Sequence, residues 1–295
     1  MRRFNSLNAA YLALLSCAID SGHRTSPRGL PTRELNHVLI TIDNPRNRLL
    51  SNSARKWNLG LAFGELAWHL SGSKDVEALA AYARIWRRYA TDSEVMGSCY
   101  GFRMFSAAPG VLSQWDLCKE LLRNDPQTRR ALIQLYNSSE NYIGSPDVSC
   151  ATSLQFGLRR GRLDLTVNMR SNDAYFGFPY DVYFYANLQE LMAVELGLPL
   201  GEYVHFAVSF HLYEKDLRKV DAVLDCETVG NGSDLPLLIP EERRKYCEAE
   251  ASLRLKNDAH LGIEFADDFW RQKYSYLLDD PRSRSENYYR QESSA

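Results

Sequence analysis

Long apolar runs are missing from this chain. No stretch approaches the roughly 20 apolar residues that a membrane-spanning helix needs. The most apolar segment, residues 9–18, is not followed by a small-residue cleavage site, which a signal peptide requires. We therefore expect this segment to be a helix, and we expect a cytoplasmic protein with no membrane partner.

An excess of charge of one sign is also missing. The 35 lysines and arginines nearly balance the 37 aspartates and glutamates, so the formal net charge is only -2. Proteins that bind nucleic acid broadly carry a marked excess of positive charge. We therefore expect no nucleic-acid partner.

Clusters of metal-binding side chains are absent from the sequence as well. The six cysteines are scattered without a Cys-x-x-Cys pair, and the six histidines include no His-Glu-x-x-His pattern. This scatter disfavours both a zinc site and a disulfide framework. We expect reduced thiols and no metal.

Internal repeats and low-complexity linkers are not found either. The composition is that of a globular protein, with 45% hydrophobic and 24% charged residues. A chain of 295 residues forms one large domain or two small ones. We predict a single domain over residues 1–295, with a charged surface tail from about residue 279.

The spacing of apolar residues predicts mainly helices in the first half of the chain. An amphipathic helix ends near Gly22, and a turn-rich loop follows at residues 26–31. Apolar residues at i, i+3, i+4 and i+7 within 63–70 predict the next helix. Two more helices are predicted over 76–89 and 111–122, and an Asn-Asp-Pro sequence stops the second.

Strands are predicted at one place in the first half and repeatedly in the second half. Residues 37–42 are rich in β-branched side chains, and the runs 148–158 and 163–169 flank an Arg-Arg-Gly-Arg turn typical of a hairpin. A Gly-Phe-Pro turn at 177–179 opens a helix, and 202–213 is strand-like. Helices and antiparallel strands mixed in this way favour an α+β fold.

Short motifs follow one another along most of the chain. They read Ser-Cys-Ala-Thr-Ser-Leu-Gln-Phe from 149, Arg-Ser-Asn-Asp from 170, Gly-Phe-Pro-Tyr-Asp from 177 and His-Leu-Tyr from 211. Upstream matches are Gly-Glu-Leu-Ala-Trp from 64, Trp86, Tyr100-Gly101, and Asn124-Asp125-Pro126 leading to Arg129-Arg130. In order and spacing, these motifs resemble the thymidylate synthase family over residues 1 to about 220.

The resemblance implies a thymidylate synthase-like α+β fold. In this fold, helices pack on a large mixed or antiparallel sheet, and one sheet face forms a homodimer interface. The resemblance also implies an enzyme that acts on a pyrimidine nucleotide monophosphate, with 5,10-methylenetetrahydrofolate as co-substrate. The single domain is then a catalytic one.

The chain departs from the family pattern at three places. Ala151 follows the nucleophile, where the family usually has His. Asp181 stands where methyl-transferring members carry Asn, and where the deoxycytidylate and cytidylate hydroxymethylases carry Asp. The C-terminal sequence does not resemble the short apolar tail of thymidylate synthases.

Cys150 is the predicted nucleophile. The C5 atom of a pyrimidine reacts only after a group has added to C6, and a polarisable thiolate suits that addition. A thiolate needs positive charge nearby, and phosphate-binding arginines supply it. The alternative is a small buried strand residue, which is what most cysteines are.

An anion site for the nucleotide phosphate is implied by the resemblance. Guanidinium groups bind a phosphate dianion bidentately, and a serine hydroxyl adds a donor. The implied residues are Arg28, Arg170 and Ser171 of one subunit, and Arg129 and Arg130 of its partner in an obligate homodimer. A solvated turn is the alternative for the twin arginines, and Arg33 is the alternative to Arg28.

Asp181 is the predicted base-recognition residue. Cytosine offers the N4 amino group as a donor and N3 as an acceptor, and a carboxyl that shares a proton with N3 matches both. An ionised carboxylate would face O4 of uracil with its lone pairs, and buried mismatches of this kind discriminate strongly. The alternative role for Asp181 is an N-cap of the following helix.

The other site residues are given by the resemblance alone. Glu65 shuttles protons, Tyr100 holds a catalytic water, and His211 and Tyr213 bind a sugar hydroxyl. The folate pocket is lined by Trp86, Asp173 and Gly177. The alternatives are a solvated helix glutamate for Glu65, a half-buried sheet pair for His211 and Tyr213, and core packing for Trp86.

These observations predict a (deoxy)cytidylate 5-hydroxymethyltransferase. Cys150 adds to C6 of the base, C5 receives the one-carbon unit, water adds to the resulting exocyclic methylene, and Cys150 departs. The alternative within the family is a thymidylate synthase that methylates dUMP and releases dihydrofolate. The alternative from another class is an inert relative that binds nucleotide or RNA. The sequence leaves CMP and dCMP both open.

Overall fold

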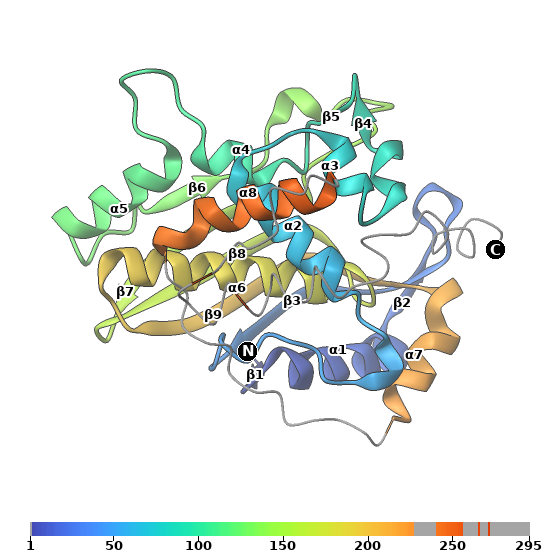
Figure 1. The fold of residues 1–295 in the computed structure, drawn as a ribbon. Coiled ribbons are helices and arrows are strands. Elements are labelled where there is room, and N and C mark those ends of the chain that lie inside the picture. Colours follow the sequence, from blue (N-terminus) through green and yellow to red (C-terminus); the bar gives the residue numbers. More distant parts are fainter. Residues whose placement is uncertain (1, 227–239, 256–264, 266–270, 272–295) are drawn as a thin grey trace. The chain divides into compact units, whose positions relative to one another are not determined.

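The computed structural model describes residues 2–226, 240–255, 265 and 271 (Figure 1). Contacts between Cα atoms group the chain into two compact units. Unit 1 comprises Met1–Trp57, Leu117–Gln134 and Cys150–Leu235, and unit 2 comprises Asn58–Asp116, Leu135–Ser149 and Pro236–Ala295. The single catalytic domain stays a prediction, and the predicted tail from residue 279 lies outside the described residues.

Unit 1 is built around a mixed β-sheet. Its strands lie in the order β1 (Arg2–Phe4), β3 (Thr32–Ile42), β9 (Leu200–Tyr213), β8 (Arg162–Asp173), β7 (Ala151–Arg159) and β6 (Leu132–Gln134), and β2 (His23–Thr25) also pairs with β3. The pairs β1–β3 and β8–β9 are parallel, and the other neighbours are antiparallel. The predicted α+β fold with a mixed sheet is confirmed.

The predicted hairpin is formed by β7 and β8. Arg159 pairs with Arg162, so the turn has two residues, Arg160 and Gly161. Both turn residues have positive φ angles, 53° and 71°. Two central residues with φ above zero make a type I′ turn, whose twist suits the flanking strands.

Helices cover one face of this sheet. The helix α1 (Leu7–Ser21) contacts β3 and β9, and α6 (Gly177–Leu196) contacts β8 and β9. The two helices also contact each other, so they lie on the same face (Figure 1). The third helix, α7 (Leu217–Leu224), packs on α1. The predicted helix ending near Gly22 and the helix opened by Gly177 are both observed.

The central strands change their burial pattern at one level of the sheet. β7 has a bulge between Ala151 and Ser153, and the pairing of β3 with β9 skips His37, whose φ is 57°. On β8 the alternation of buried residues reaches Met169 and resumes, one position out of phase, at Asn172. A shift of one residue turns a side chain to the opposite face. Asn172 is therefore buried on the helix-covered side.

Unit 2 is mainly helical. Its elements are α2 (Leu59–Ser71), α3 (Val76–Ala80), the hairpin β4 (Ala90–Thr91) and β5 (Glu94–Val95), α4 (Tyr100–Phe105) and α8 (Arg243–Arg254). The helix α2 contacts α3, α4 and α8. The helix α5 (Gln114–Asn124) begins in unit 2 and ends in unit 1. The described residues of the two units also form the 3-10 turns η1 (Pro27–Gly29), η2 (Ser53–Arg55), η3 (Arg84–Arg88), η4 (Ser138–Glu140), η5 (Glu214–Asp216) and η6 (Pro240–Glu242).

The predicted helix over 76–89 is wrong in its second half. Helix α3 ends at Ala80, Ala83 is extended, and only the 3-10 turn η3 follows. Tyr82 explains the break, because its hydroxyl donates to Glu250 of α8 at 2.7 Å and its ring lies against Gly64 of α2. These tertiary contacts override the local preference for helix.

The helix predicted over 111–122 begins later than expected. It starts at Gln114, because the hydroxyl oxygen of Ser113 accepts the backbone N–H of Asp116 at 3.0 Å, as a helix-capping serine does. Its end at Asn124 fits the predicted stop before Pro126.

Gly101 allows α4 to approach α2 closely. A Cβ atom at position 101 would lie 1.7 Å from the carbonyl oxygen of His69. The Gly101→Ala variant is expected to lower the free energy of unfolding by about 3 kcal/mol, because two backbones must separate. Urea denaturation measures this loss. In the control variant Gly157→Ala the new Cβ comes no closer than 3.6 Å to any heavy atom outside the adjoining residues. Equal stability of the two variants would contradict the expectation.

Candidate active site

Cys150 lies in a bend immediately before β7 and is half-buried. Its carbonyl oxygen accepts the backbone N–H of Arg170 at 2.9 Å, and the Nη2 atom of Arg170 lies 3.9 Å from its sulfur. Burial raises the pKa of Cys118 and of Cys247 to about 12. Those two thiols are thus held in the protonated form, whereas Cys150 has a guanidinium beside it, the setting that a nucleophilic thiolate requires.

Asp181 lies inside the first turn and a half of α6 and is half-buried. The predicted alternative, an N-cap, is wrong because the N-cap residue is Phe176. The Oδ2 atom of Asp181 instead accepts a hydrogen bond of 2.7 Å from the Asn172 side chain. Burial raises the pKa of Asp181 to about 7, with the charge of Asp173 adding to the rise and the Asn172 hydrogen bond opposing it.

One short stretch of β8 links Cys150 with Asp181. Arg170 contacts the cysteine, and Asn172, two residues further on, contacts the acid. Two residues along a strand span about 7 Å. The predicted nucleophile and the predicted base-recognition group are therefore brought to the same end of β8.

His211 and Tyr213 lie at the end of β9, beside the end of β8. Their rings meet edge to face at 5.1 Å, as expected for strand residues two apart. Asp173 pairs in register with His211. Burial lowers the pKa of His211 more than its acidic neighbours raise it, so the ring is neutral near pH 7. Ser171 is half-buried on the same stretch of β8.

The arginines differ in what they contact. Arg33 donates to the carbonyl of Ile19 at 2.7 Å and lies 3.9 Å from Glu214, so its guanidinium group is already held by neighbouring residues. Arg28 is exposed in a left-handed conformation with φ at 55°, and its charge acts on His211. Arg28 is thus the loop arginine that no described acidic group holds and whose charge acts on His211.

The twin arginines lie between α5 and β6. Arg129 and Arg130 are both exposed, and neither has an ion-pair partner among the residues that the structure describes. The backbone N–H of Arg130 donates to the Thr128 hydroxyl at 3.2 Å. Exposure of both residues is what a solvated turn and an interface donor alike require.

Glu65, Tyr100 and Trp86 belong to unit 2. Glu65 and His69 are one turn apart on α2 and share a face. The ring of His69 stacks on Tyr100 at 5.5 Å, and its Nδ1 atom accepts the N–H of Gly101 at 3.3 Å. Burial lowers the pKa of His69 to about 3, so this acceptor is neutral. The face of α2 that carries Glu65 therefore also holds Tyr100.

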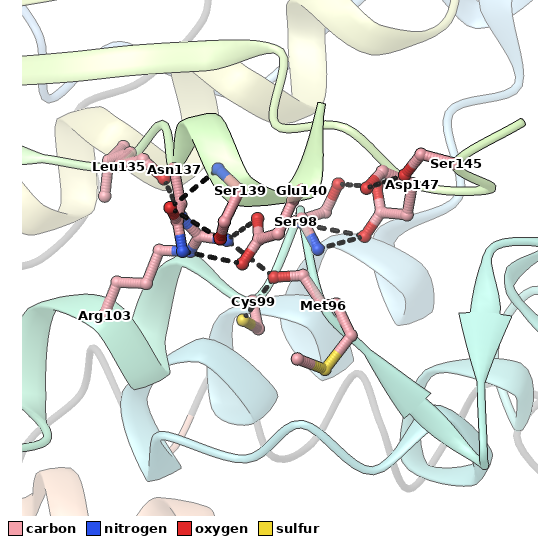
Figure 2. A network of polar contacts seen from close by, with 11 residues as sticks. Met96, Ser98, Cys99, Arg103, Leu135, Asn137, Ser139, Glu140, Ser145 and Asp147 are labelled. Carbon is pink, nitrogen blue, oxygen red and sulfur yellow. Dashed lines mark hydrogen bonds and ion pairs between the residues drawn. The ribbon is translucent and has the colours of Figure 1, made fainter. Parts of the chain in front are cut away.

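A polar network fixes the segment before Tyr100 (Figure 2). The carboxylate of Asp147 accepts the N–H groups of Gly97 and Ser98 at 2.8 and 2.7 Å, and the Ser98 hydroxyl at 2.7 Å. Arg103 pairs with Glu140 and donates to the carbonyls of Leu135 and Met96. These contacts join the loop 135–149, which leads to Cys150 along the chain, to the start of α4.

The three predicted folate residues, Asp173, Gly177 and Trp86, have different surroundings. The Oδ1 atom of Asp173 accepts two backbone N–H groups, at 2.9 and 3.0 Å, and no described residue hydrogen-bonds its Oδ2. A Cβ atom at Gly177 would lie 3.5 Å from Oδ2 of Asp181, so the glycine leaves space beside the acid. The role of Asp173 and Gly177 in a folate pocket stays a prediction. Trp86 packs partly on the cluster around Trp68 in unit 2, as core packing predicts.

Three residues of the site were not predicted from the sequence. Asn172 donates to Asp181, and it is in turn contacted by His205, which Tyr203 contacts. Asn172 stands within the Arg-Ser-Asn-Asp motif, but no role was assigned to it. Tyr203 and His205 are signalled by their alternation along a strand, which is equally typical of core packing.

The described residues show neither of two other kinds of site. No helix in residues 2–226 or 240–255 has the length and apolar character needed to cross a membrane. The same residues contain no group of three or more His, Cys, Asp and Glu side chains arranged to hold a metal ion.

Comparison with known proteins identifies the family. A model of the thymidylate synthase family matches residues 9–248. The chain is 30% identical over 290 residues to a deoxyuridylate hydroxymethyltransferase of Bacillus phage SP01, covering 91% of this chain and 75% of that protein. Its fold is similar to that of the thermostable thymidylate synthase A from Bacillus subtilis, with a TM-score of 0.67 and 23% identity over 80% of this chain and 90% of that one. The chain therefore belongs to the thymidylate synthase family, whose members transfer a one-carbon unit from folate to a pyrimidine nucleotide.

Proposed function

We propose that the protein is a 5-hydroxymethyltransferase acting on a cytosine nucleotide, CMP or dCMP, with 5,10-methylenetetrahydrofolate as co-substrate. The observation that carries the choice of base is the protonatable carboxyl of Asp181, whose pKa is raised to about 7. The relative from phage SP01, named as a hydroxymethyltransferase, supports the hydroxymethyl product.

Base pairing follows from the neutral form of Asp181. A neutral carboxyl offers one O–H donor and one acceptor oxygen. The O–H donates to N3 of cytosine while the other oxygen accepts from the N4 amino group. Both hydrogen bonds form in a partly buried place, where an unpaired polar group costs about 1 to 3 kcal/mol.

Cys150 supplies the covalent step. Its thiolate adds to C6 of the ring, which makes C5 nucleophilic. After C5 has bonded the one-carbon unit and lost its proton, and water has added to that unit, the thiolate leaves C6 and the ring double bond is restored. The positive charge of Arg170, at 3.9 Å, favours the anionic sulfur. Bound folate supplies the one-carbon unit at the oxidation level of formaldehyde.

The remaining predicted residues bind and move protons. Arg28 and Arg170 hold the phosphate with Ser171, and the neutral ring of His211 and the hydroxyl of Tyr213 bind the sugar. Glu65 transfers protons through water that Tyr100 positions. The contact of His69 with Tyr100 supports this role, since it fixes the tyrosine on the face of α2 that carries Glu65.

Hydroxymethyl transfer to deoxyuridylate is the second candidate. The relative named deoxyuridylate hydroxymethyltransferase favours it. A neutral Asp181 also pairs with uracil if its proton sits on the other oxygen, facing O4. The two candidates thus differ in which oxygen of one carboxyl carries the proton.

A substrate panel tests the proposal. The purified protein is incubated with 5,10-methylenetetrahydrofolate and cytidylate, deoxycytidylate or deoxyuridylate, each labelled with tritium at C5. We expect tritium release with a cytosine nucleotide, a product heavier by one hydroxymethyl group, and no dihydrofolate absorbance. A methylated product with dihydrofolate would instead identify a thymidylate synthase, and no release from any substrate would identify an inert relative.

The cytoplasm is the proposed location. No disulfide joins any of the six cysteines, all of which lie in the described part of the chain. Thiols persist where the surroundings are reducing.

We also propose that the enzyme is a homodimer. The sheet face opposite α1 and α6 exposes apolar side chains, among them Leu39 at 40% and Val208 at 44%. Leu39 pairs with Phe206 on β9, and Val208 follows two residues later, so these side chains lie together. An apolar face of this kind is typical of an interface. It supports a dimer in which Arg129 and Arg130 reach the partner's phosphate site.

Mixing two inactive variants tests the shared site. Cys150→Ser and the double variant Arg129→Ala/Arg130→Ala are expected to restore about a quarter of wild-type tritium release when their subunits are exchanged, because each mixed dimer has one intact site. Mixing Cys150→Ser with Arg170→Ala is the control and is expected to restore nothing, since both residues belong to one subunit. Mixed dimers without recovered activity would refute the donation of the twin arginines.

A further inference from the structure

A chain of hydrogen bonds runs from the protein core to Asp181. The hydroxyl of Tyr203 lies 3.1 Å from Nδ1 of His205, and Nε2 of His205 lies 2.9 Å from Oδ1 of Asn172. The Nδ2 atom of Asn172 lies 2.7 Å from Oδ2 of Asp181. Tyr203, His205 and Asn172 are buried with exposures of 0, 0 and 3%, so no bulk water competes for these bonds.

The chain has a single direction. The NH2 group of Asn172 donates to Oδ2 of Asp181, so Oδ1 of Asn172 is the atom that faces His205. Burial lowers the pKa of His205 to about 3, so the ring is neutral and carries one N–H. That N–H must be on Nε2 to reach Oδ1 of Asn172. Nδ1 is then the acceptor of the Tyr203 hydroxyl.

This direction determines the two oxygens of Asp181. Oδ2 receives a donated N–H, which suits a carbonyl oxygen better than a hydroxyl. When Asp181 is neutral, its proton is therefore placed on Oδ1. No described residue hydrogen-bonds Oδ1, which leaves this donor for a ligand. The order of donor and acceptor along the carboxyl is thus fixed before a base binds.

We propose that Asn172, His205 and Tyr203 are positioning residues that set base choice by holding the Asp181 proton on Oδ1. This inference rests on the proposed function, and it names what separates cytosine from uracil. With Oδ2 kept as an acceptor, it faces the N4 amino group and Oδ1–H faces N3. In the reverse order that uracil needs, the proton must move to Oδ2 and compete with the Asn172 N–H.

We call Asn172, His205 and Tyr203 the relay. The other charged and titratable groups around Asp181 do not determine which of its oxygens carries the proton. On β8, Asp173 raises the pKa of Asp181. On β9, the charge of Asp181 acts on Tyr203, and the hydrogen bonds of Tyr203 and the neutral His205 reach the acid through Asn172. Among these neighbours, Asn172 is the group that donates to the acid.

Substitutions that change one hydrogen bond test the relay. In Tyr203→Phe, Nδ1 of His205 loses its donor, so both tautomers form and Asn172 can turn its amide. We expect the ratio of kcat/KM for cytidylate to that for deoxyuridylate to fall about tenfold, which is what one net hydrogen bond supplies. We expect the ratio to fall mainly because kcat/KM for deoxyuridylate rises.

Two further variants separate positioning from packing. His205→Leu removes the donor to Asn172 and is expected to lower the ratio as Tyr203→Phe does. His205→Gln keeps an N–H donor and is expected to restore most of the ratio. The matched control is Tyr185→Phe, which removes a hydroxyl from a fully buried tyrosine of α6 outside the relay. An unchanged ratio in Tyr203→Phe, or an equal fall in Tyr185→Phe, would overturn the proposal.

A measurement without substrate keeps the relay distinct from the proposed function. In protein labelled with 15N-histidine, we expect the His205 nitrogen shifts of the Nε2–H tautomer, and a mixture of tautomers in Tyr203→Phe. If these shifts are observed but the wild type prefers deoxyuridylate, the hydrogen-bond direction is right, but the proposed base and the control of base choice by these residues are both wrong. An Nδ1–H tautomer in the wild type would refute the relay whatever the substrate.

Discussion

Cys150→Ser is expected to lower turnover by about 10⁴-fold or more, while binding of the nucleotide is kept. A serine hydroxyl does not ionise near pH 7, so no anion adds to C6 of the pyrimidine. The arginines that hold the phosphate are unchanged. Tritium release from C5 of the labelled nucleotide measures turnover, and equilibrium dialysis measures binding.

Cys17→Ser is the matched control for this loss. Cys17 is also half-buried, also lies in unit 1 and also has an arginine, Arg2, beside its sulfur. A thiol next to a guanidinium is therefore not sufficient, and the position before β7 is what distinguishes Cys150. Activity retained in Cys150→Ser, or lost equally in Cys17→Ser, would end the covalent mechanism.

The sequence predicted those elements whose pattern is local. The β7–β8 hairpin follows from a turn in which Arg160 and Gly161 both take positive φ. The end of α2 follows from Gly72, which caps the helix in a left-handed conformation. The break after Ala80 was missed because it depends on the contact of Tyr82 with α8, about 170 residues away along the chain.

The residues of the site likewise fall into those with a local sequence signal and those that depend on long-range contacts. Cys150, Asp181 and the arginines stand in motifs that a family pattern records, so they were found from the sequence. The relay behind Asp181 needs β8 and β9 to lie side by side in register, with Asn172 turned to the helix-covered face by the change of phase after Met169. The amino-acid sequence alone does not show that β8 and β9 pair in this register.

The choice of Arg28 over Arg33 shows what the structure adds. Both arginines lie in or beside the same predicted loop, and their residue type alone does not separate them. Arg33 is held by the carbonyl of Ile19 and by Glu214, whereas Arg28 is exposed with its charge acting on His211. An arginine that is already paired has less to gain from a phosphate, which supports Arg28 as the ligand.

The use of cytidylate is expected to fall about 50-fold between pH 7 and pH 9. Asp181 pairs with cytosine in its neutral form, and a pKa of about 7 means that this form falls from about half of the protein at pH 7 to about 1% at pH 9. The direction follows from the sign of the shift, since a raised pKa keeps the carboxyl protonated below pH 7 and ionised above it. Because kcat/KM reports groups of the unliganded enzyme, its alkaline limb is the quantity to measure.

Asp181→Asn is expected to remove this alkaline limb, because an amide has a donor and an acceptor at every pH. Asp164→Asn is the matched control. Asp164 also lies on β8, burial also raises its pKa, and it accepts the N–H of Glu202 at 2.8 Å, away from Asn172. The control is expected to keep the limb with its midpoint near pH 7.

The unliganded protein gives an independent check on the same group. Because the folded state holds the Asp181 proton more tightly than the unfolded chain does, the free energy of unfolding should fall as pH rises through about 7. Asp181→Asn should lessen that fall and raise Tm at pH 8 relative to the wild type. A fall in activity that persists in Asp181→Asn would assign the limb to another group, and cytosine recognition would then not depend on a protonated acid at this position.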